Sequence, residues 1–164
     1  MALRLILMRH AKSAWDDPLT EDFDRPLNGR GRASSTVIGA WLVRHGYLPD
    51  QVLSSSSKRT RETWEGLGLT CPRARFTERL YRASAEAILE ELRAANGTSV
   101  LLLAHNPGIA EFAARFANHP RDDTDFRRYP TTATAVFDIA ADRWSDVRFG
   151  VNKLRDFVCP QDLL

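Results

Sequence analysis

Cysteine is almost absent from the sequence. Its 164 residues include only two cysteines, Cys71 and Cys159, which form neither a metal-binding spacing nor a disulfide framework. Two unpaired thiols suit a reducing compartment, so we expect a cytoplasmic protein. The formal net charge is only +2, which gives no reason to expect nucleic acid or an anionic membrane as a partner.

Long hydrophobic segments are also missing. The short apolar run near the amino terminus lacks a preceding basic region and a following small-residue cleavage site, so we expect no signal peptide. No stretch approaches the ~18 apolar residues that a transmembrane helix needs. The apolar fraction of 43% and the charged fraction of 27% are those of an ordinary globular protein. The length fits one domain spanning residues 1–164.

Short apolar runs alternate with helical patterns along the chain. The predicted strands cover residues 3–8, 51–54, 75–77, 99–104, 133–139 and 147–151. The predicted helices run from Asn28 to about residue 45, from a serine in 54–57 through residues 58–63, from Ser84 to about residue 95, and through residues 109–116. Residues 11–27 and 120–130 are predicted loops. The alternation predicts an α/β fold, a three-layer α/β/α sandwich with a mostly parallel central sheet.

Basic side chains follow three of these predicted strands. Arg9 and His10 end the first strand, Arg59 begins the helix after the second, and His105 ends the most apolar strand. Ligands of such sheets bind beyond the carboxyl ends of the strands. We therefore expect these four residues to meet at one edge of the sheet.

Histidine and arginine together suit phosphoryl chemistry. A neutral imidazole can attack phosphorus and form a phosphohistidine, and guanidinium groups bind phosphate oxygens with a planar fork of donors. Neighbouring arginines should also lower the pKa of the histidine and keep it neutral. Taken singly, each residue has an ordinary alternative role: a hydrogen-bonded structural histidine or a solvated arginine. Taken together, Arg9, His10, Arg59 and His105 predict a phosphate cage.

Four motifs occur in order and carry a specific resemblance. They are Met-Arg-His-Ala-Lys-Ser, Arg-Pro-Leu-Asn-Gly-Arg-Gly, Ser-Ser-Lys-Arg-Thr-Arg-Glu-Thr and Leu-Leu-Ala-His-Asn-Pro-Gly. With these motifs the chain resembles the histidine phosphatase superfamily, which has the phosphoglycerate mutase-like fold. It is most similar to the SixA-like phosphohistidine phosphatases. The resemblance extends from residue 3 to about residue 160.

The resemblance implies roles for individual residues. His10 would be the phosphorylated nucleophile, and Arg9, Arg59 and His105 would complete the phosphate pocket. The frequent Arg-His-Gly of the family is Arg-His-Ala here, a form that the SixA-like branch often shows. Candidate substrate-binding residues are those next to the motif residues and one in a loop that relatives bring near the phosphate: Lys12, Ser13, Asn106 and Thr132.

The proton donor is the least defined part of this site. Glu78 matches the position of the general acid in the mutase branch, but a surface ion pair explains it equally well, and the SixA-like branch typically lacks the acid. Three carboxylates in the loop after His10 are weaker candidates: Asp16, Asp17 and Asp24. We interpret Asp24 as a structural tie of that loop. The imidazole of phosphohistidine, with a pKa of about 6.5, departs more easily than a serine alcohol, so it needs little acid catalysis.

These observations predict a metal-independent phosphatase without a cofactor. Arginines supply the positive charge that a metal provides elsewhere. The short segments 11–27 and 83–97 suggest an open mouth, which favours a phosphohistidine-bearing protein as the substrate. Alternatives are a phosphatase of small phosphorylated metabolites and a non-catalytic module that binds phosphorylated ligands. A mutase is disfavoured because the short chain offers little to exclude water.

Overall fold

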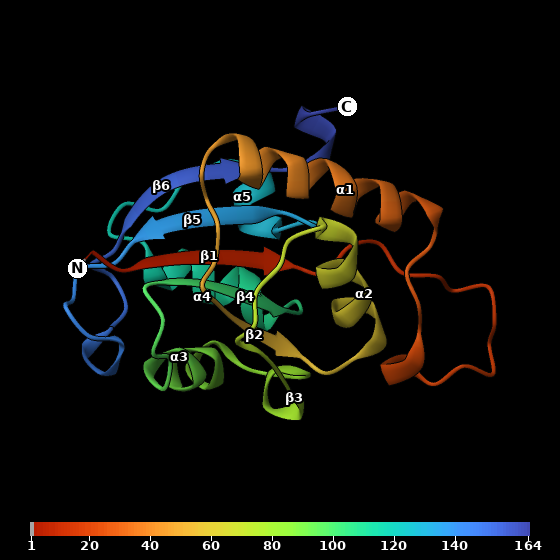
Figure 1. The fold of residues 1–164 in the computed structure, drawn as a ribbon, viewed down its shortest axis with the longest axis horizontal. Coiled ribbons are helices and arrows are strands. Elements are labelled where there is room, and N and C mark those ends of the chain that lie inside the picture. Colours follow the sequence, from red (N-terminus) through yellow and green to blue (C-terminus); the bar gives the residue numbers. More distant parts are fainter. Residues whose placement is uncertain (1) are drawn as a thin grey trace.

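The core of the molecule is a six-stranded sheet with strand order β3-β2-β4-β1-β5-β6 (Figure 1). The computed structural model describes residues 2–164, and all six strands lie within that range. The strands are β1 (Arg4–Arg9), β2 (Gln51–Ser55), β3 (Ala74–Thr77), β4 (Ser99–Ala104), β5 (Thr134–Asp138) and β6 (Lys153–Val158).

Strand directions divide the sheet into two parts. β3, β2, β4 and β1 are parallel to one another, whereas β5 is antiparallel to β1 and β6 is antiparallel to β5. The parallel strands are short apolar runs joined by helices, as expected for strands buried on both faces. The predicted α/β class with a mostly parallel sheet is confirmed.

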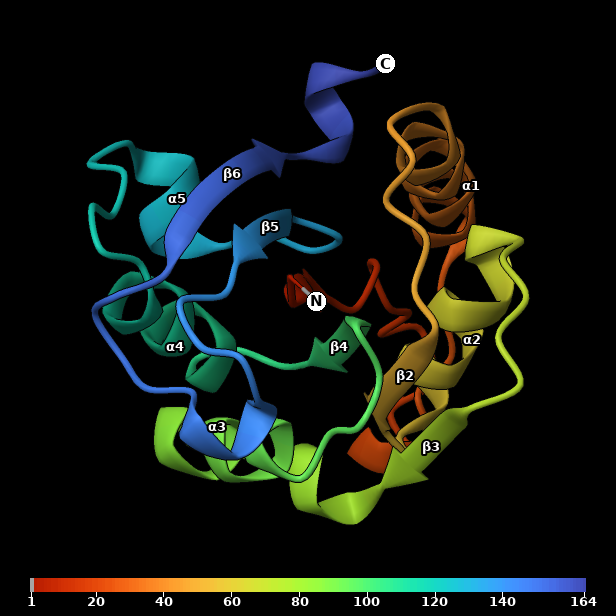
Figure 2. The same ribbon diagram turned by 60° about the vertical axis from the view of Figure 1, so that its left-hand side comes forward.

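Helices cover both faces of the sheet (Figure 2). One layer holds α1 (Gly29–Arg44) and α2 (Lys58–Leu67), and the other holds α3 (Ala85–Arg93), α4 (Gly108–Phe116) and α5 (Thr124–Arg128). Side chains of β1 alternate between the two faces. Ile6 and Met8 pack in the core cluster that contains side chains of α1, whereas Leu5 and Leu7 pack in the cluster that contains side chains of α4.

Two of the helix starts follow the predicted signals. The Asn28 side chain accepts a hydrogen bond from the Gly31 N–H at 2.8 Å, and Ser84 accepts one from Ala87 at 3.1 Å. Gly46 follows α1 with a φ of 70°, a left-handed conformation that favours glycine. Ser57 occupies the N-cap position of α2 but makes no capping bond, because its hydroxyl contacts Thr60 instead at 2.8 Å.

The last predicted strand is wrong. Residues 147–151 form no strand, and the edge strand β6 begins at Lys153. The chain turns at Gly150, where φ is 81°, before the strand starts. β6 carries three charged residues, Lys153, Arg155 and Asp156, which suit a solvent-facing edge but hide the strand from a search for apolar runs.

Short helices interrupt several segments that the sequence indicates as loops. The predicted loop 120–130 contains α5, which is too short to show a helical period. Single 3-10 turns occur at η1 (Asp22–Asp24), η2 (Glu78–Leu80), η3 (Trp144–Asp146) and η4 (Pro160–Asp162). Across residues 2–164, no helix combines the length and the apolar character that crossing a membrane requires.

Because α1 packs closely against the loop after β1, we expect one added methyl group at Gly31 to destabilise the protein. A Cβ added at Gly31 would lie 2.1 Å from the Lys12 carbonyl oxygen, whereas at Gly29 the nearest atom would be 3.9 Å away. We expect Gly31→Ala to lower the free energy of unfolding by about 1–3 kcal/mol, because backbone must move. Gly29→Ala is the matched control and should not destabilise the protein. Urea unfolding of both variants checks this, and equal stabilities would contradict it.

Candidate active site

The register of β1 and β4 brings two histidines together. Arg9 is paired with Ala104, so His10 and His105 leave neighbouring strands at the same edge. Their ring centroids are 5.0 Å apart, and both side chains are buried. This is the meeting of strand ends that the sequence predicts.

His10 is held as a neutral ring with one free nitrogen. Its Nδ1 lies 2.7 Å from the Ala11 carbonyl oxygen. A carbonyl only accepts hydrogen bonds, so Nδ1 carries the proton and Nε2 keeps its lone pair. Burial, together with the nearby His105 and Arg9, holds the pKa of His10 well below its ordinary value. A neutral imidazole with an unprotonated Nε2 is the form that can act as a nucleophile.

His105 presents its other nitrogen to the site. Its Nε2 lies 2.8 Å from the Ser55 hydroxyl and 3.4 Å from the Ser57 hydroxyl. The Ser55 oxygen also accepts the Ser57 N–H. The Nδ1 of His105 is buried without a partner. Burial first, and then the charge of Arg59, lower the pKa of His105 to about 3.

Arg9 and Arg59 add two guanidinium groups. Arg9 donates from Nη1 to the Tyr129 carbonyl at 3.2 Å, and burial followed by the charge of Arg59 lowers its pKa. Arg59 is 6% exposed, and its Nε, like that of Arg9, has no partner. Unpartnered buried N–H groups are costly. Both residues line the same cavity, where an anion can make charge-assisted bonds to their guanidinium groups.

Asp22 is the acidic residue that the sequence interpretation missed. Its carboxylate accepts from Arg25 at 3.0 Å, from Arg59 at 3.1 Å and from the Tyr81 hydroxyl at 2.5 Å. Burial alone would raise its pKa, but the bonds from Tyr81 and Arg25 and the charge of Arg59 hold the pKa well below its ordinary value. Asp22 is therefore an ionised anchor for two arginines.

Asp22, rather than Asp24, ties the loop 11–27 to the site. No hydrogen bond or ion pair of the Asp24 side chain is found within residues 2–164, and that side chain is exposed. The sequence signal that could have pointed to Asp22 is its position three residues before Arg25, the spacing of an ion pair within one helical turn. Spacing alone does not show which of several aspartates in a loop faces inward.

The predicted substrate-binding residues meet at the site, with one shift. Lys12, Ser13 and Asn106 line a polar cavity of about 280 Å³ together with the four cage residues. Ser13 also accepts a hydrogen bond from Arg25. The loop residue that lines this cavity is Thr131. Thr132 is fully buried with a φ of 63°, and its N–H donates to the carbonyls of Arg9 and His10, so it supports the backbone of the motif.

Glu78 is not brought into the site. Its side chain is exposed at the start of η2, and it lines neither the polar cavity nor the larger one beside it. Its match to the general-acid position of the mutase branch suggested a place near the cage. In the structure Glu78 follows β3 at an exposed position, and the chain is buried again at Leu80.

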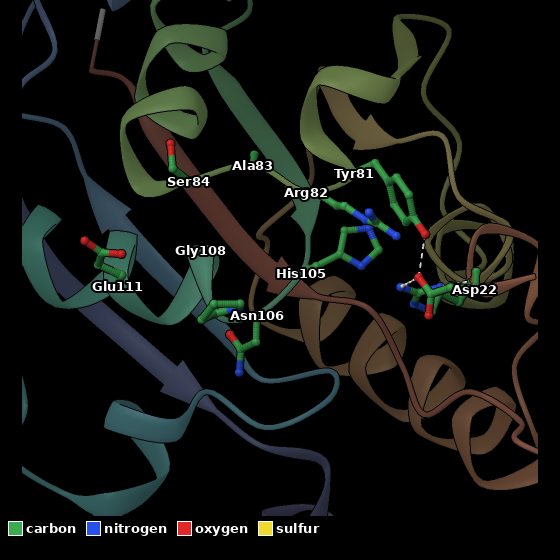
Figure 3. Close-up of a pocket in the computed structure, with 11 residues that line it drawn as sticks. Asp22, Tyr81, Arg82, Ala83, Ser84, His105, Asn106, Gly108 and Glu111 are labelled. Atoms are coloured by element: carbon green, nitrogen blue, oxygen red, sulfur yellow. Dashed lines mark hydrogen bonds and ion pairs between the residues drawn. The ribbon is translucent and has the colours of Figure 1, made fainter.

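A second, larger cavity adjoins the polar one (Figure 3). Its volume is about 560 Å³, and it shares Arg59, His105 and Asn106 with the polar cavity. Its further walls come from η1, the segment after η2 and the start of α4: Asp22, Tyr81, Arg82, Ala83, Ser84, Pro107, Gly108 and Glu111. Within residues 2–164, no group of three or more His, Cys, Asp or Glu side chains is placed to hold a metal ion.

Comparisons with known proteins agree with this geometry. The family model of the histidine phosphatase superfamily (branch 1) matches residues 5–81. An uncharacterized protein of Mycobacterium tuberculosis is 35% identical over 161 residues, which cover 94% of this chain and 100% of the relative.

Two solved structures share the architecture over nearly the whole chain, and both carry the provisional name phosphohistidine phosphatase SixA. The one from Agrobacterium tumefaciens has 31% sequence identity and a TM-score of 0.76, and covers 98% of this chain and 99% of that chain. The one from Nakamurella multipartitia has 27% identity and a TM-score of 0.81, and covers 98% and 97%. The chain belongs to the histidine phosphatase superfamily, and its architecture is SixA-like.

Proposed function

We propose that this chain is a phosphohistidine phosphatase that transfers the phosphoryl group to His10 and then to water. One observation carries the proposal: His10, with its Nε2 unprotonated, lines one polar cavity together with Arg9, Arg59 and His105. A nucleophile beside two guanidinium groups and a second imidazole is an arrangement suited to phosphoryl transfer.

The reaction has two balanced steps. His10 Nε2 attacks phosphorus, the bond from phosphorus to the substrate nitrogen breaks, and the departing imidazole takes a proton from solvent. Water then attacks the phosphorus on His10, the P–Nε2 bond breaks, and phosphate leaves with the enzyme restored. The three donor residues bind the non-bridging oxygens in both steps. Lys12, Ser13 and Asn106 bind the same group from the wall of the cavity, and Thr132 holds the backbone beneath it.

The lack of a protonated carboxyl group supports an N-linked substrate. Among residues 2–164, no carboxylate lines the polar cavity, and those that line the larger one are Asp22 and Glu111. Asp22 stands beside it, but with its pKa held low it is a poor proton donor. An alkoxide leaving group needs a general acid, whereas the imidazole of phosphohistidine can be protonated by solvent near neutral pH. The provisional names of the Agrobacterium and Nakamurella structures support the same substrate class.

A comparison of two peptides tests the proposed function. We expect phosphate release in EDTA from a phosphohistidine peptide and much slower release from the matching phosphoserine peptide. Because Glu78 lies outside both cavities, Glu78→Gln should leave both rates within about twofold of wild type. Fast phosphoserine turnover that Glu78→Gln abolishes would instead identify a committed general acid. Loss of turnover in EDTA, restored by a divalent ion, would overturn metal independence.

The volume of the larger cavity also suits a second class of substrate, small phosphorylated metabolites. A cavity of about 560 Å³ has the size of an ordinary small-molecule site. Turnover of small phosphorylated metabolites without turnover of the phosphohistidine peptide would favour that class. Phosphate binding without any turnover would indicate a binding module. Action in the cytoplasm is part of our proposal, in keeping with the free thiols of Cys71 and Cys159.

A further inference from the structure

The two adjoining cavities differ in their access to His10. His10 lines the polar cavity and does not line the larger one, whereas Arg59, His105 and Asn106 line both. A phosphoryl group held by Arg59 and His105 would therefore border both cavities, with His10 in the wall of the polar one. Phosphoryl transfer places the attacking and leaving atoms roughly in line through phosphorus.

From this arrangement we infer that the larger cavity is the leaving-group site, and that it accepts the imidazole ring and flanking peptide of a phosphohistidine. The inference rests on the proposed function and deepens it, because it names the surface that recognises the substrate beyond its phosphoryl group. The cavity is twice the size of the polar one, about 560 Å³ against about 280 Å³. Ammonia or another minimal leaving group would leave most of it unfilled.

Tyr81 gives this cavity a fixed aromatic wall. Its hydroxyl donates to Asp22, and its ring meets Phe23 edge-on with centroids 4.9 Å apart. The same ring lies edge-on to His105 at 5.4 Å, directly beside the phosphoryl site. A planar ring leaving His105 and Arg59 would therefore contact a flat apolar surface that is already held in place.

The remaining walls suit a peptide. Ala83 and Pro107 add apolar surface, and Glu111 adds an exposed negative charge. The Arg82 guanidinium lies over the Tyr81 ring, 5.2 Å from its centroid (Figure 3). The start of α4 packs tightly on the segment after η2, since a Cβ at Gly108 would lie 1.9 Å from the Ala83 carbonyl oxygen. The floor is thus rigid, and the polar rim can bind the backbone or charged neighbours of the histidine.

Filling the cavity tests the inference. Ala83→Trp is compared with Ala141→Trp, a matched control: both alanines are half-buried against the same core cluster, and Ala141 lines a separate cavity of about 580 Å³. The substrates are a phosphohistidine peptide and phosphoramidate, whose leaving group is only ammonia. We expect Ala83→Trp to lower the ratio of kcat/KM for the peptide to kcat/KM for phosphoramidate at least tenfold. Ala141→Trp should leave the ratio unchanged.

If Ala83→Trp does not fold, a second variant that fills the larger cavity tests the inference. Glu111→Trp places a large side chain at an exposed position of α4 on the opposite rim, and it should lower the same ratio. An unchanged ratio in the folded variants would overturn the inference. So would a fall in the ratio for Trp15→Ala alone, because Trp15 lines only the polar cavity. If wild-type protein hydrolyses neither substrate, the proposed function itself fails, which is a distinct result.

Discussion

Replacing His10 with asparagine is expected to lower the rate of phosphate release from a phosphohistidine peptide by at least about 10³-fold. The asparagine amide can still donate to the Ala11 carbonyl, as His10 Nδ1 does at 2.7 Å. It offers no counterpart of Nε2, so the bond to phosphorus cannot form. The variant therefore removes the nucleophile and preserves the local hydrogen bond.

Binding of inorganic phosphate should persist in His10→Asn. The proposed phosphate-binding residues Arg9, Arg59 and His105 line the polar cavity from their own elements, and their hydrogen bonds go to groups other than the His10 ring. Calorimetric titration with phosphate measures this directly. The control is His119→Asn, which changes an exposed histidine in the segment after α4 and should keep wild-type turnover. Turnover by His10→Asn within tenfold of wild type would show that another group attacks phosphorus.

The meeting of His10 and His105 could be predicted because it follows from the topology of the sheet. Short apolar runs followed by helical patterns indicate parallel strands, and parallel strands present their carboxyl ends at one edge. The register that pairs Arg9 with Ala104 then brings His10 and His105 to within 5.0 Å between ring centroids. No side-chain detail was needed for that conclusion.

The residues that complete the site depend on loop geometry, which the sequence does not encode in a periodic signal. Asp22 binds Arg25 and Arg59 only because a one-turn helix points it inward. Thr131 reaches the cavity because its neighbour Thr132 adopts a left-handed conformation with a φ of 63°. Non-glycine residues rarely adopt that conformation, and local propensity gives no warning of it.

The edge of the sheet was missed for a different reason. β6 buries little surface, and its charged residues keep the edge from pairing with other chains. A search for apolar runs therefore finds the central strands and overlooks this one. Burial on both faces makes β1 and β4 easy to predict from apolar runs. β6 is hard to predict because it is not buried in this way.

The stability of the protein is expected to fall by about 2 kcal/mol between pH 6.5 and pH 4.5 through His105, and further through His10. Burial keeps the pKa of His105 near 3, so its ring is neutral in the folded protein across this range, and burial also holds the pKa of His10 well below its ordinary value. In the unfolded chain each ring takes up a proton below pH 6.5. Protonation thus favours unfolding, and the stability contributed by the neutral rings is complete only above that pH.

Urea unfolding at the two pH values, in buffer without phosphate, measures this loss. His105→Gln should reduce the loss by about 2 kcal/mol, whatever its effect at pH 6.5, and His10→Asn should reduce it too, because each removes one proton that unfolding takes up. His119→Asn is the control for replacing a histidine at an exposed position outside the cage. The carboxyl group of Asp22, whose pKa is also held low, adds to acid unfolding mainly below the window, as its unfolded value is about 3.9. Equal losses in wild type and both site variants would mean that the two histidines already carry charge in the folded protein, and a charged His10 would have no lone pair with which to attack phosphorus.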